Sequence, residues 1–181
     1  MSDFGYKHPI QLLYDIEQQG KAAAKGLPQQ VDIQDTWSGI GFRIGDTNLV
    51  APLDQVNEIL HYPNLTLVPG TKQWVKGIAN VRGTLLPVMD LNGYLGKKLS
   101  AVAQKTRILV VKYEDMTVGI VVDEVLGLKH FGDEDKVTAV KKFDDSLRSY
   151  IQGAFRQNEV ETLVFNMHAL AIHPEFFQVA V

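Results

Sequence analysis

The pattern of apolar and polar positions changes near the end of the first fifth of the chain. Before that point, Leu12, Leu13 and Ile16 recur at helical spacing behind Pro9, and a Gly-Leu-Pro stretch follows the pattern. This arrangement predicts a helix over residues 9–25. We expect its apolar face to pack on the rest of the chain or on a partner.

From Trp37 onward the pattern becomes one of short apolar runs rich in branched side chains, such as residues 118–122, with turn signals between them. Runs of this spacing are typical of small barrels or sandwiches and do not fit alternating strand–helix units. We therefore expect an N-terminal extension (1–36), a strand-rich domain (37–172) and a C-terminal tail (173–181).

Two offsets superimpose the first half of the strand-rich domain on the second half without gaps. An offset of 69 places residues 42–59 over residues 111–128, and an offset of 76 places residues 74–95 over residues 150–171. Apolar positions coincide in both alignments, and the two matches occur in the same order. Self-similarity of this kind indicates a duplicated structural unit.

Each repeat is predicted to form one small five-stranded β-barrel, so the predicted fold class is mainly β, with an added N-terminal helix. The first β unit would comprise about residues 37–96, and the second about residues 104–172. Closure suits units of this size because it hides the edges of the sheet.

Matched residues in the two repeats suit the same bends and strand ends. Gly77 and Gly153 coincide and suit a bend or a close approach of two backbones. Asp90 and Asn166 coincide directly after an apolar run. Because Asp and Asn side chains accept hydrogen bonds from the free N–H groups of a first helical turn, both should end a strand and cap a short helix.

Composition and charge narrow the classes of function. The chain has 181 residues, no cysteine and a net charge of −3. The lack of cysteine excludes disulfides, thiolate catalysis and zinc ribbons, and the weak negative charge argues against a nucleic-acid partner. No apolar stretch has the ~18 residues of a membrane helix, and the N-terminus lacks a signal-peptide pattern, so we expect a cytoplasmic protein without direct membrane insertion.

Residues with the chemistry for catalysis or metal binding are sparse. The five histidines lack metal-ligand spacing, and the chain contains neither a phosphate-binding loop nor a serine elbow, so no metal or cofactor is expected. Asp90 and Asp123 leave one alternative open, a hydrolase that uses paired acids. Their repeat counterparts, Asn166 and Asp54, do not put two acids in equivalent loops. This mismatch favours the interpretation of both acids as strand-end caps.

Asn80-Val81-Arg82-Gly83 is the remaining polar feature. The second repeat has Arg156-Gln157-Asn158-Glu159 at these positions, so the scaffold does not require the first set. Arginine beside a glycine turn offers directional donors, and arginine is enriched at the energetic centres of protein interfaces. The residues by themselves leave two interpretations open: a solvated turn, or the recognition site of a generic β-barrel interaction module.

The same stretch carries a resemblance to a known family. Residues 77–91, together with residues 56–60 and 118–125, resemble the signature of the CheW-like domain, in the order and spacing of that family. The resemblance covers about residues 37–172. Val81 stands where the family usually has leucine.

The resemblance implies a non-enzymatic adaptor. CheW-like proteins join the cytoplasmic tip of a methyl-accepting chemoreceptor to the regulatory domain of a CheA-type histidine kinase, in arrays beneath the membrane. The N-terminal extension and the tail are similar to the subgroup that serves type IV pili and twitching motility. A free monomer, recruited from the cytoplasm to such arrays, is the expected state. The family motifs imply the following partner-binding residues: Asn80, Arg82, Gly83, Val56, Glu58, Thr106, Arg107 and Leu128.

Overall fold

The chain divides into two compact units, residues 1–34 and residues 35–181. The computed structural model describes three segments: residues 9–23, 36–138 and 143–181. In the first unit, helix α1 covers Pro9–Ala23 and exposes Leu13. Residues 24 and 25 of the predicted helix lie outside the described residues, as do the side chains of Leu12 and Ile16.

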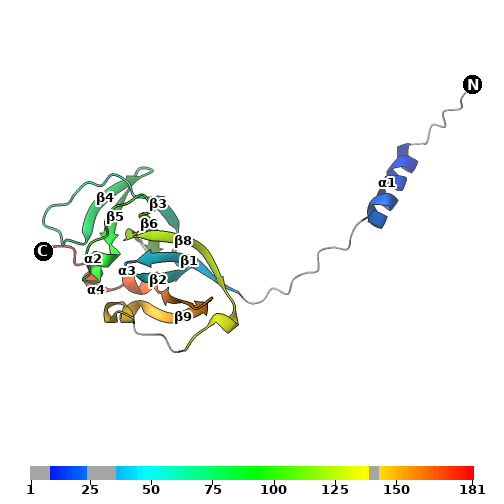
Figure 1. Cartoon of the computed structure of the whole chain (residues 1–181). Helices are drawn as coiled ribbons and strands as arrows, with labels where there is room; N and C mark the ends of the chain where they lie inside the picture. The colour runs from blue at the N-terminus through cyan, green and yellow to red at the C-terminus, as the bar shows by residue number, and fades with distance from the viewer. Residues whose placement is uncertain (1–8, 24–35, 139–142) are drawn as a thin grey trace, which may run out of the picture. The chain divides into compact units, whose positions relative to one another are not determined.

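The second unit is mainly β and has only short helices (Figure 1). Its strands are β1 (Trp37–Ile44), β2 (Thr47–Pro52), β3 (Glu58–His61), β4 (Val75–Val81), β5 (Thr84–Asp90), β6 (Arg107–Tyr113), β7 (Met116–Val122), β8 (Glu124–Phe131), β9 (Ile151–Gln157) and β10 (Val160–Phe165). Its helices are η1 (Leu53–Gln55), α2 (Leu91–Tyr94), η2 (Asp133–Asp135), η3 (Asp145–Tyr150), α3 (Met167–Ala171) and α4 (Pro174–Phe177). None of the described helices, α1 included, is both long enough and apolar enough to cross a bilayer.

The ten strands form two curled five-stranded sheets, as predicted from the sequence. Sheet A has the order β8-β1-β2-β10-β9, and sheet B has the order β3-β6-β7-β5-β4. Neighbouring strands are antiparallel except for two parallel pairs, β2 with β10 and β5 with β7.

The strands are shared between the sheets differently from the prediction that each repeat builds its own barrel, and that part of the prediction is wrong. Sheet A combines the hairpin β1–β2 of the first repeat with β8, β9 and β10 of the second, and sheet B does the reverse. The crossings occur at matching places in the two repeats. Asp123 alone separates β7 from β8, and residues 53–57 separate β2 from β3, and both connections pass from one sheet into the other.

The duplication itself is present in the register of the two sheets. Gly41 pairs with Gly127 in sheet A. At the offset of 69 the counterpart of Gly41 is Val110 and that of Gly127 is Glu58, and these two residues pair in sheet B. Val50 pairs with Val164 in sheet A. Their counterparts, Gly119 at the offset of 69 and Val88 at the offset of 76, pair in sheet B. The sheets are thus pseudo-equivalent strand by strand.

The predicted helix caps are confirmed at both corners. Asp90 accepts a hydrogen bond from the Gly93 amide at 3.1 Å at the start of α2, and Asn166 accepts one from the Ala169 amide at 2.9 Å at the start of α3. These caps satisfy amide groups of first helical turns that have no partner within the helix.

A single core joins the two sheets. Alternate residues of each strand face opposite sides. Leu49 and Ala51 of β2 enter the shared core together with Ile120 of β7, whereas Val50 and Val121 enter separate clusters on the other faces. The two sheets therefore pack on each other through one face of each sheet. The opposite face of each sheet buries a small apolar cluster of its own.

Candidate partner-binding surface

The β4–β5 hairpin ends in a two-residue turn. Val81 pairs with Thr84, and the residues between them, Arg82 and Gly83, have φ angles of +52° and +86°. Two positive φ angles define a type I′ turn, which matches the twist of the flanking strands. The Asn80 side chain fastens the turn by accepting a hydrogen bond from the Gly83 amide at 2.9 Å.

The turn geometry belongs to the scaffold, whereas the arginine does not. The matching β9–β10 turn holds Asn158 and Glu159, also with positive φ angles, of 49° and 63°. A non-glycine residue in the left-handed region costs roughly 1 kcal/mol, and asparagine tolerates this region better than arginine. Arg82 therefore occupies a backbone position that its side chain does not favour.

Arg82 forms an ion pair with Glu58 on β3. Its Nη2 donates to Glu58 Oε1 at 2.6 Å, and its Nη1 donates to Oε2 at 3.4 Å. Since β3 and β4 are the two edges of sheet B, the pair bridges opposite edges of a strongly curled sheet. The Arg82 side chain remains 79% exposed and that of Glu58 32% exposed. Positions matching Arg82 and Glu58 in the other sheet hold Asn158 and Gly127, which cannot form such a pair.

The ion pair lies at the rim of an apolar depression. This pocket has a volume of about 230 Å³. Besides Arg82 and Glu58 it is lined by Val81, Thr84, Leu86, Val110 and Thr117. Leu86 and Val110 belong to the apolar cluster of sheet B. The surface thus combines exposed guanidinium donors with an apolar floor, which is the composition of a protein-recognition site.

The structure brings together only part of the predicted set. Asn80, Arg82, Gly83 and Glu58 meet at the hairpin turn. Val56 is half-buried and packs against the shared core two residues before Glu58.

The other predicted residues lie elsewhere in the second unit. Arg107 pairs with His61, three residues along β3 from Glu58, and its guanidinium donates to the Gln104 carbonyl at 2.7 Å. Thr106 is 1% exposed, and its hydroxyl donates to the Ala101 carbonyl at 3.2 Å. Leu128 lies on β8 of sheet A and is 50% exposed.

Sequence reasoning missed Val110 and Thr117 as lining residues. Both come from the second repeat and reach the first-repeat hairpin only through the exchange of strands. It also missed Glu124 on β8, whose carboxylate lies 3.0 Å from Lys105 Nζ and 3.2 Å from Arg43 Nη2. Hydrogen bonds lower the pKa of the Glu124 carboxyl; the one from Lys105 has the larger effect and the one from Arg43 the smaller.

Asp90 and Asp123, the two acids of the hydrolase alternative, are both engaged in holding the fold. Asp90 is fully buried and accepts hydrogen bonds from the Ser100 amide at 2.8 Å and from the Ser100 hydroxyl at 3.1 Å. Asp123 accepts from the Gly45 amide at 2.6 Å and from the Asn92 side-chain amide at 3.2 Å. Asp123 thereby links the β1–β2 turn of sheet A to α2 beside sheet B.

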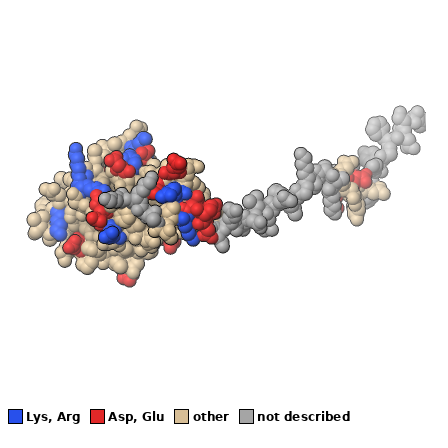
Figure 2. Space-filling view, turned by 60° about the horizontal axis from the view of Figure 1, so that its bottom comes forward, with Lys and Arg blue, Asp and Glu red and all other residues tan. Residues whose placement is uncertain are grey.

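Charge is mixed over the surface. On the face shown in Figure 2, acidic and basic side chains are interspersed, in keeping with the net charge of −3. In the described part of the chain, no group of three or more His, Cys, Asp or Glu side chains is placed to hold a metal ion.

Comparison with known proteins agrees with this geometry. The model of the CheW-like domain family matches residues 38–175. Protein PilI of Pseudomonas aeruginosa is 47% identical over 173 residues, which cover 96% of this chain and 97% of that protein. The chemotaxis protein CheW of Helicobacter pylori is 33% identical over 113 residues, covering 62% of this chain and 68% of that protein.

Among solved structures, the scaffolding protein TtCheW of Thermoanaerobacter tengcongensis shares the fold. It superimposes with a TM-score of 0.65 at 18% identity, over 79% of this chain and 98% of that chain. The family match spans most of the residues, and one relative is similar over nearly the whole length. This protein belongs to the CheW-like domain family and is a non-enzymatic chemotaxis adaptor of that family.

Proposed function

We propose that this chain couples the cytoplasmic tip of a methyl-accepting chemoreceptor to the regulatory domain of a CheA-type histidine kinase, in a pathway that controls type IV pili and twitching motility. The pilus assignment rests on the similarity to PilI. The protein would be a cytoplasmic monomer when free and would join receptor arrays at the membrane through its partners.

The observation that carries the proposal is the Arg82–Glu58 ion pair above the apolar pocket. It occurs in only one of two pseudo-equivalent sheets, so folding of the sheet does not require it. It also keeps an arginine in a left-handed turn position where asparagine would be less strained. Fixed guanidinium donors beside an apolar floor suit a hot spot, where a few residues supply most of the binding energy.

We assign different roles to the other predicted residues. Asn80 and Gly83 would hold the turn that presents Arg82. Arg107 and Leu128 are placed to add peripheral contacts, Leu128 through its exposed side chain. Val56 and Thr106 would shape the surface from below, because the first packs on the core and the second is buried.

The test compares two matched arginine substitutions. Arg82→Ala and Arg156→Ala each remove an arginine from a hairpin end, and each breaks an ion pair, to Glu58 and to Glu161 respectively. We expect Arg82→Ala to weaken binding of a receptor-tip fragment or of the kinase regulatory domain at least tenfold in calorimetry. Arg156→Ala should leave both affinities unchanged.

Both variants should melt within a few degrees of the wild type, because an exposed ion pair contributes only about 0–1 kcal/mol. Equal binding by the two variants would refute the assignment of Arg82. A collapse of stability in Arg82→Ala would show that Arg82 is a structural turn residue.

A further inference from the structure

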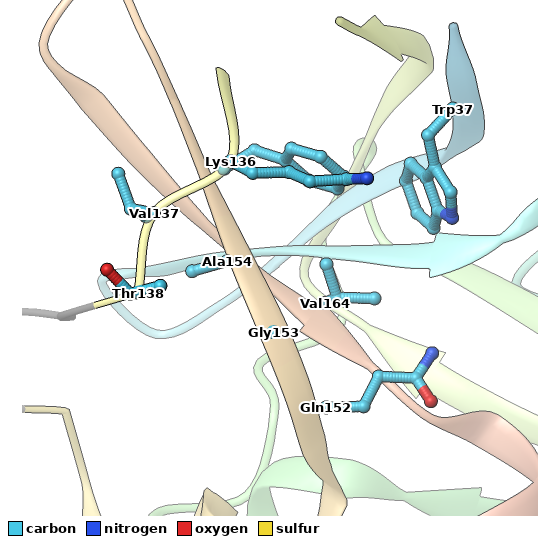
Figure 3. Close-up of a pocket in the computed structure, with 9 residues that line it drawn as sticks. Trp37, Lys136, Val137, Thr138, Gln152, Gly153, Ala154 and Val164 are labelled. Atoms are coloured by element: carbon cyan, nitrogen blue, oxygen red, sulfur yellow. The ribbon is translucent and has the colours of Figure 1, made fainter. Parts of the chain in front are cut away.

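Each sheet of the second unit has an edge strand that another segment of the chain covers. In sheet A this strand is β9: Figure 3 shows Val137 beside it, and the Val137 amide donates to the Ala154 carbonyl at 3.1 Å. In sheet B it is β4, where the amides of Thr66 and Ile78 each donate to the carbonyl of the other residue at 2.9 Å. Covers of this kind keep the free N–H and C=O groups of an edge strand from pairing with another chain.

The cover of β4, residues 62–72, is buried only at its start. Tyr62 and Leu65 pack against the apolar cluster of sheet B, whereas Leu67 is 78% exposed. The backbone nevertheless lies so close to β4 that a Cβ atom at Gly77 would overlap the Thr66 carbonyl oxygen. Packing therefore fixes where the cover begins, and its far end needs another support.

The tail, residues 173–181, supplies that support. The Lys72 amide donates to the Val179 carbonyl at 2.8 Å. The Val181 amide donates to the Gly70 carbonyl at 3.1 Å, and the two hydrogen bonds enclose an antiparallel bridge. The end of the cover is thus paired with the tail as a short pair of strands.

An aromatic contact anchors the tail just before this pairing. Phe176 on α4 is fully buried, and its ring stacks on Trp74 with centroids 5.8 Å apart and meets Tyr94 edge-on at 5.0 Å. Beyond the anchor, Val179 is half-buried and Val181 is 94% exposed. The last residues are therefore held largely by their main-chain hydrogen bonds, which can open while Phe176 stays in place.

The shared scaffold does not require this pairing. At the offset of 76, the counterparts of residues 70–72 are residues 146–148, which form part of helix η3 and not an extended segment. The family match ends at residue 175, so the paired end of the tail lies beyond it. The pairing is an addition to the duplicated fold.

We propose that the tail is a strap that controls the edge of sheet B. While the strap is paired, it keeps the cover on β4. When the strap detaches, the far end of the cover loosens, the bridge between Thr66 and Ile78 opens, and the edge of β4 becomes free to pair with an extended segment of another chain. This opening is a local event, separate from global unfolding. The proposal does not rest on the adaptor function.

Hydrogen exchange of single amides, followed by NMR on the full-length chain, tests the strap. The reporter is the Ile78 amide, whose acceptor is the Thr66 carbonyl. The Val137 amide reports the cover of sheet A, and the buried Ile120 in the central strand β7 reports global unfolding. Val181→Pro removes only the N–H that donates to Gly70, since the Val181 side chain is exposed. Val181→Ala keeps this N–H and is the matched control.

We expect the Ile78 amide to exchange about fivefold faster in Val181→Pro, the factor that one hydrogen bond contributes, and at least tenfold faster in a chain that stops at Phe177. Val137 should exchange as in the wild type, and Val181→Ala should change neither amide. An unchanged Ile78 rate in the shortened chain overturns the proposal, and so does equal acceleration of Ile78 and Val137. Exchange of Ile78 no faster than that of Ile120 would also overturn it, because the cover would then open only on global unfolding. If the shortened chain fails to fold, Val181→Pro decides alone.

Discussion

Replacing Arg82 by asparagine separates the function of the β4–β5 turn from its folding. The substitution copies the second repeat, in which Asn158 holds the matching position with a φ angle of 49°. It removes the ion pair to Glu58 and leaves the type I′ turn and its hydrogen bond from the Gly83 amide to Asn80 in place. Arg82→Asn is therefore a test that the internal symmetry of the protein supplies.

Two opposing effects determine the change in stability. Loss of an ion pair whose arginine is 79% exposed costs about 0–1 kcal/mol. Relief of the left-handed conformation returns up to about 1 kcal/mol, since asparagine can hydrogen-bond locally in that region. The two effects nearly cancel, so we expect the free energy of unfolding to change by less than about 1 kcal/mol. For a chain of this size that corresponds to a shift in melting temperature of at most about 4 °C.

Binding should respond quite differently. The asparagine side chain is too short to span the distance to a partner that the guanidinium contacts, so the affinity for the receptor tip or the kinase domain should fall at least tenfold. Urea denaturation and calorimetry on the same preparations give both quantities. Destabilisation by more than about 2 kcal/mol, beyond the combined estimate above, would refute the reasoning. So would full binding by a variant of unchanged stability.

The remaining predictions concern the scaffold. Gly77→Ala should destabilise the protein by at least about 2 kcal/mol in urea denaturation, because its φ angle is +130° and its Cβ atom would overlap the carbonyl that lies over it. Asp144 has its pKa lowered to about 2 by hydrogen bonds from Ser146 and Lys97, so its charge stabilises the fold above pH 4 and the contribution disappears as the pH falls through 2. Asp144→Asn should therefore melt lower than wild type at pH 6, and the difference should shrink as the pH falls below 4 and vanish below pH 2. Because one core joins the sheets, fluorescence of Trp37 (sheet A) and of Trp74 (beside α2) should report the same urea midpoint when each is the sole tryptophan; separate midpoints would show that the sheets unfold independently.

Much of the fold could be predicted because the duplication repeats the same local rules twice. The capping residues Asp90 and Asn166 follow apolar runs at one offset, and both caps form as expected. The exchange of strands could not be predicted, because the one-residue connection from β7 to β8 and the longer connection over residues 53–57 both cross from one sheet to the other. The alternation of apolar and polar positions locates strands along the chain but does not say which strands pair.

The candidate site was predictable to a smaller extent. Arg82 and Gly83 stand out from the sequence because the second repeat has Asn158 and Glu159 at the matching positions. The link from Arg82 to Glu58 joins opposite edges of a sheet, and curvature of that degree is not visible in the alternation of side chains.

The shared core has a consequence for an adaptor with surfaces on both sheets. The Arg82 surface lies on sheet B and the exposed Leu128 side chain on sheet A, and residues such as Leu49 and Ile120 bury their side chains in one common cluster. Two domains joined by a flexible linker would leave the angle between two bound partners free. Here neither sheet can rotate without exposing that core, at a cost of about 25 cal/mol for every Å² of apolar surface. A partner on one sheet is therefore held in a fixed orientation relative to a partner on the other, which is the mechanical requirement of a scaffold without chemistry of its own.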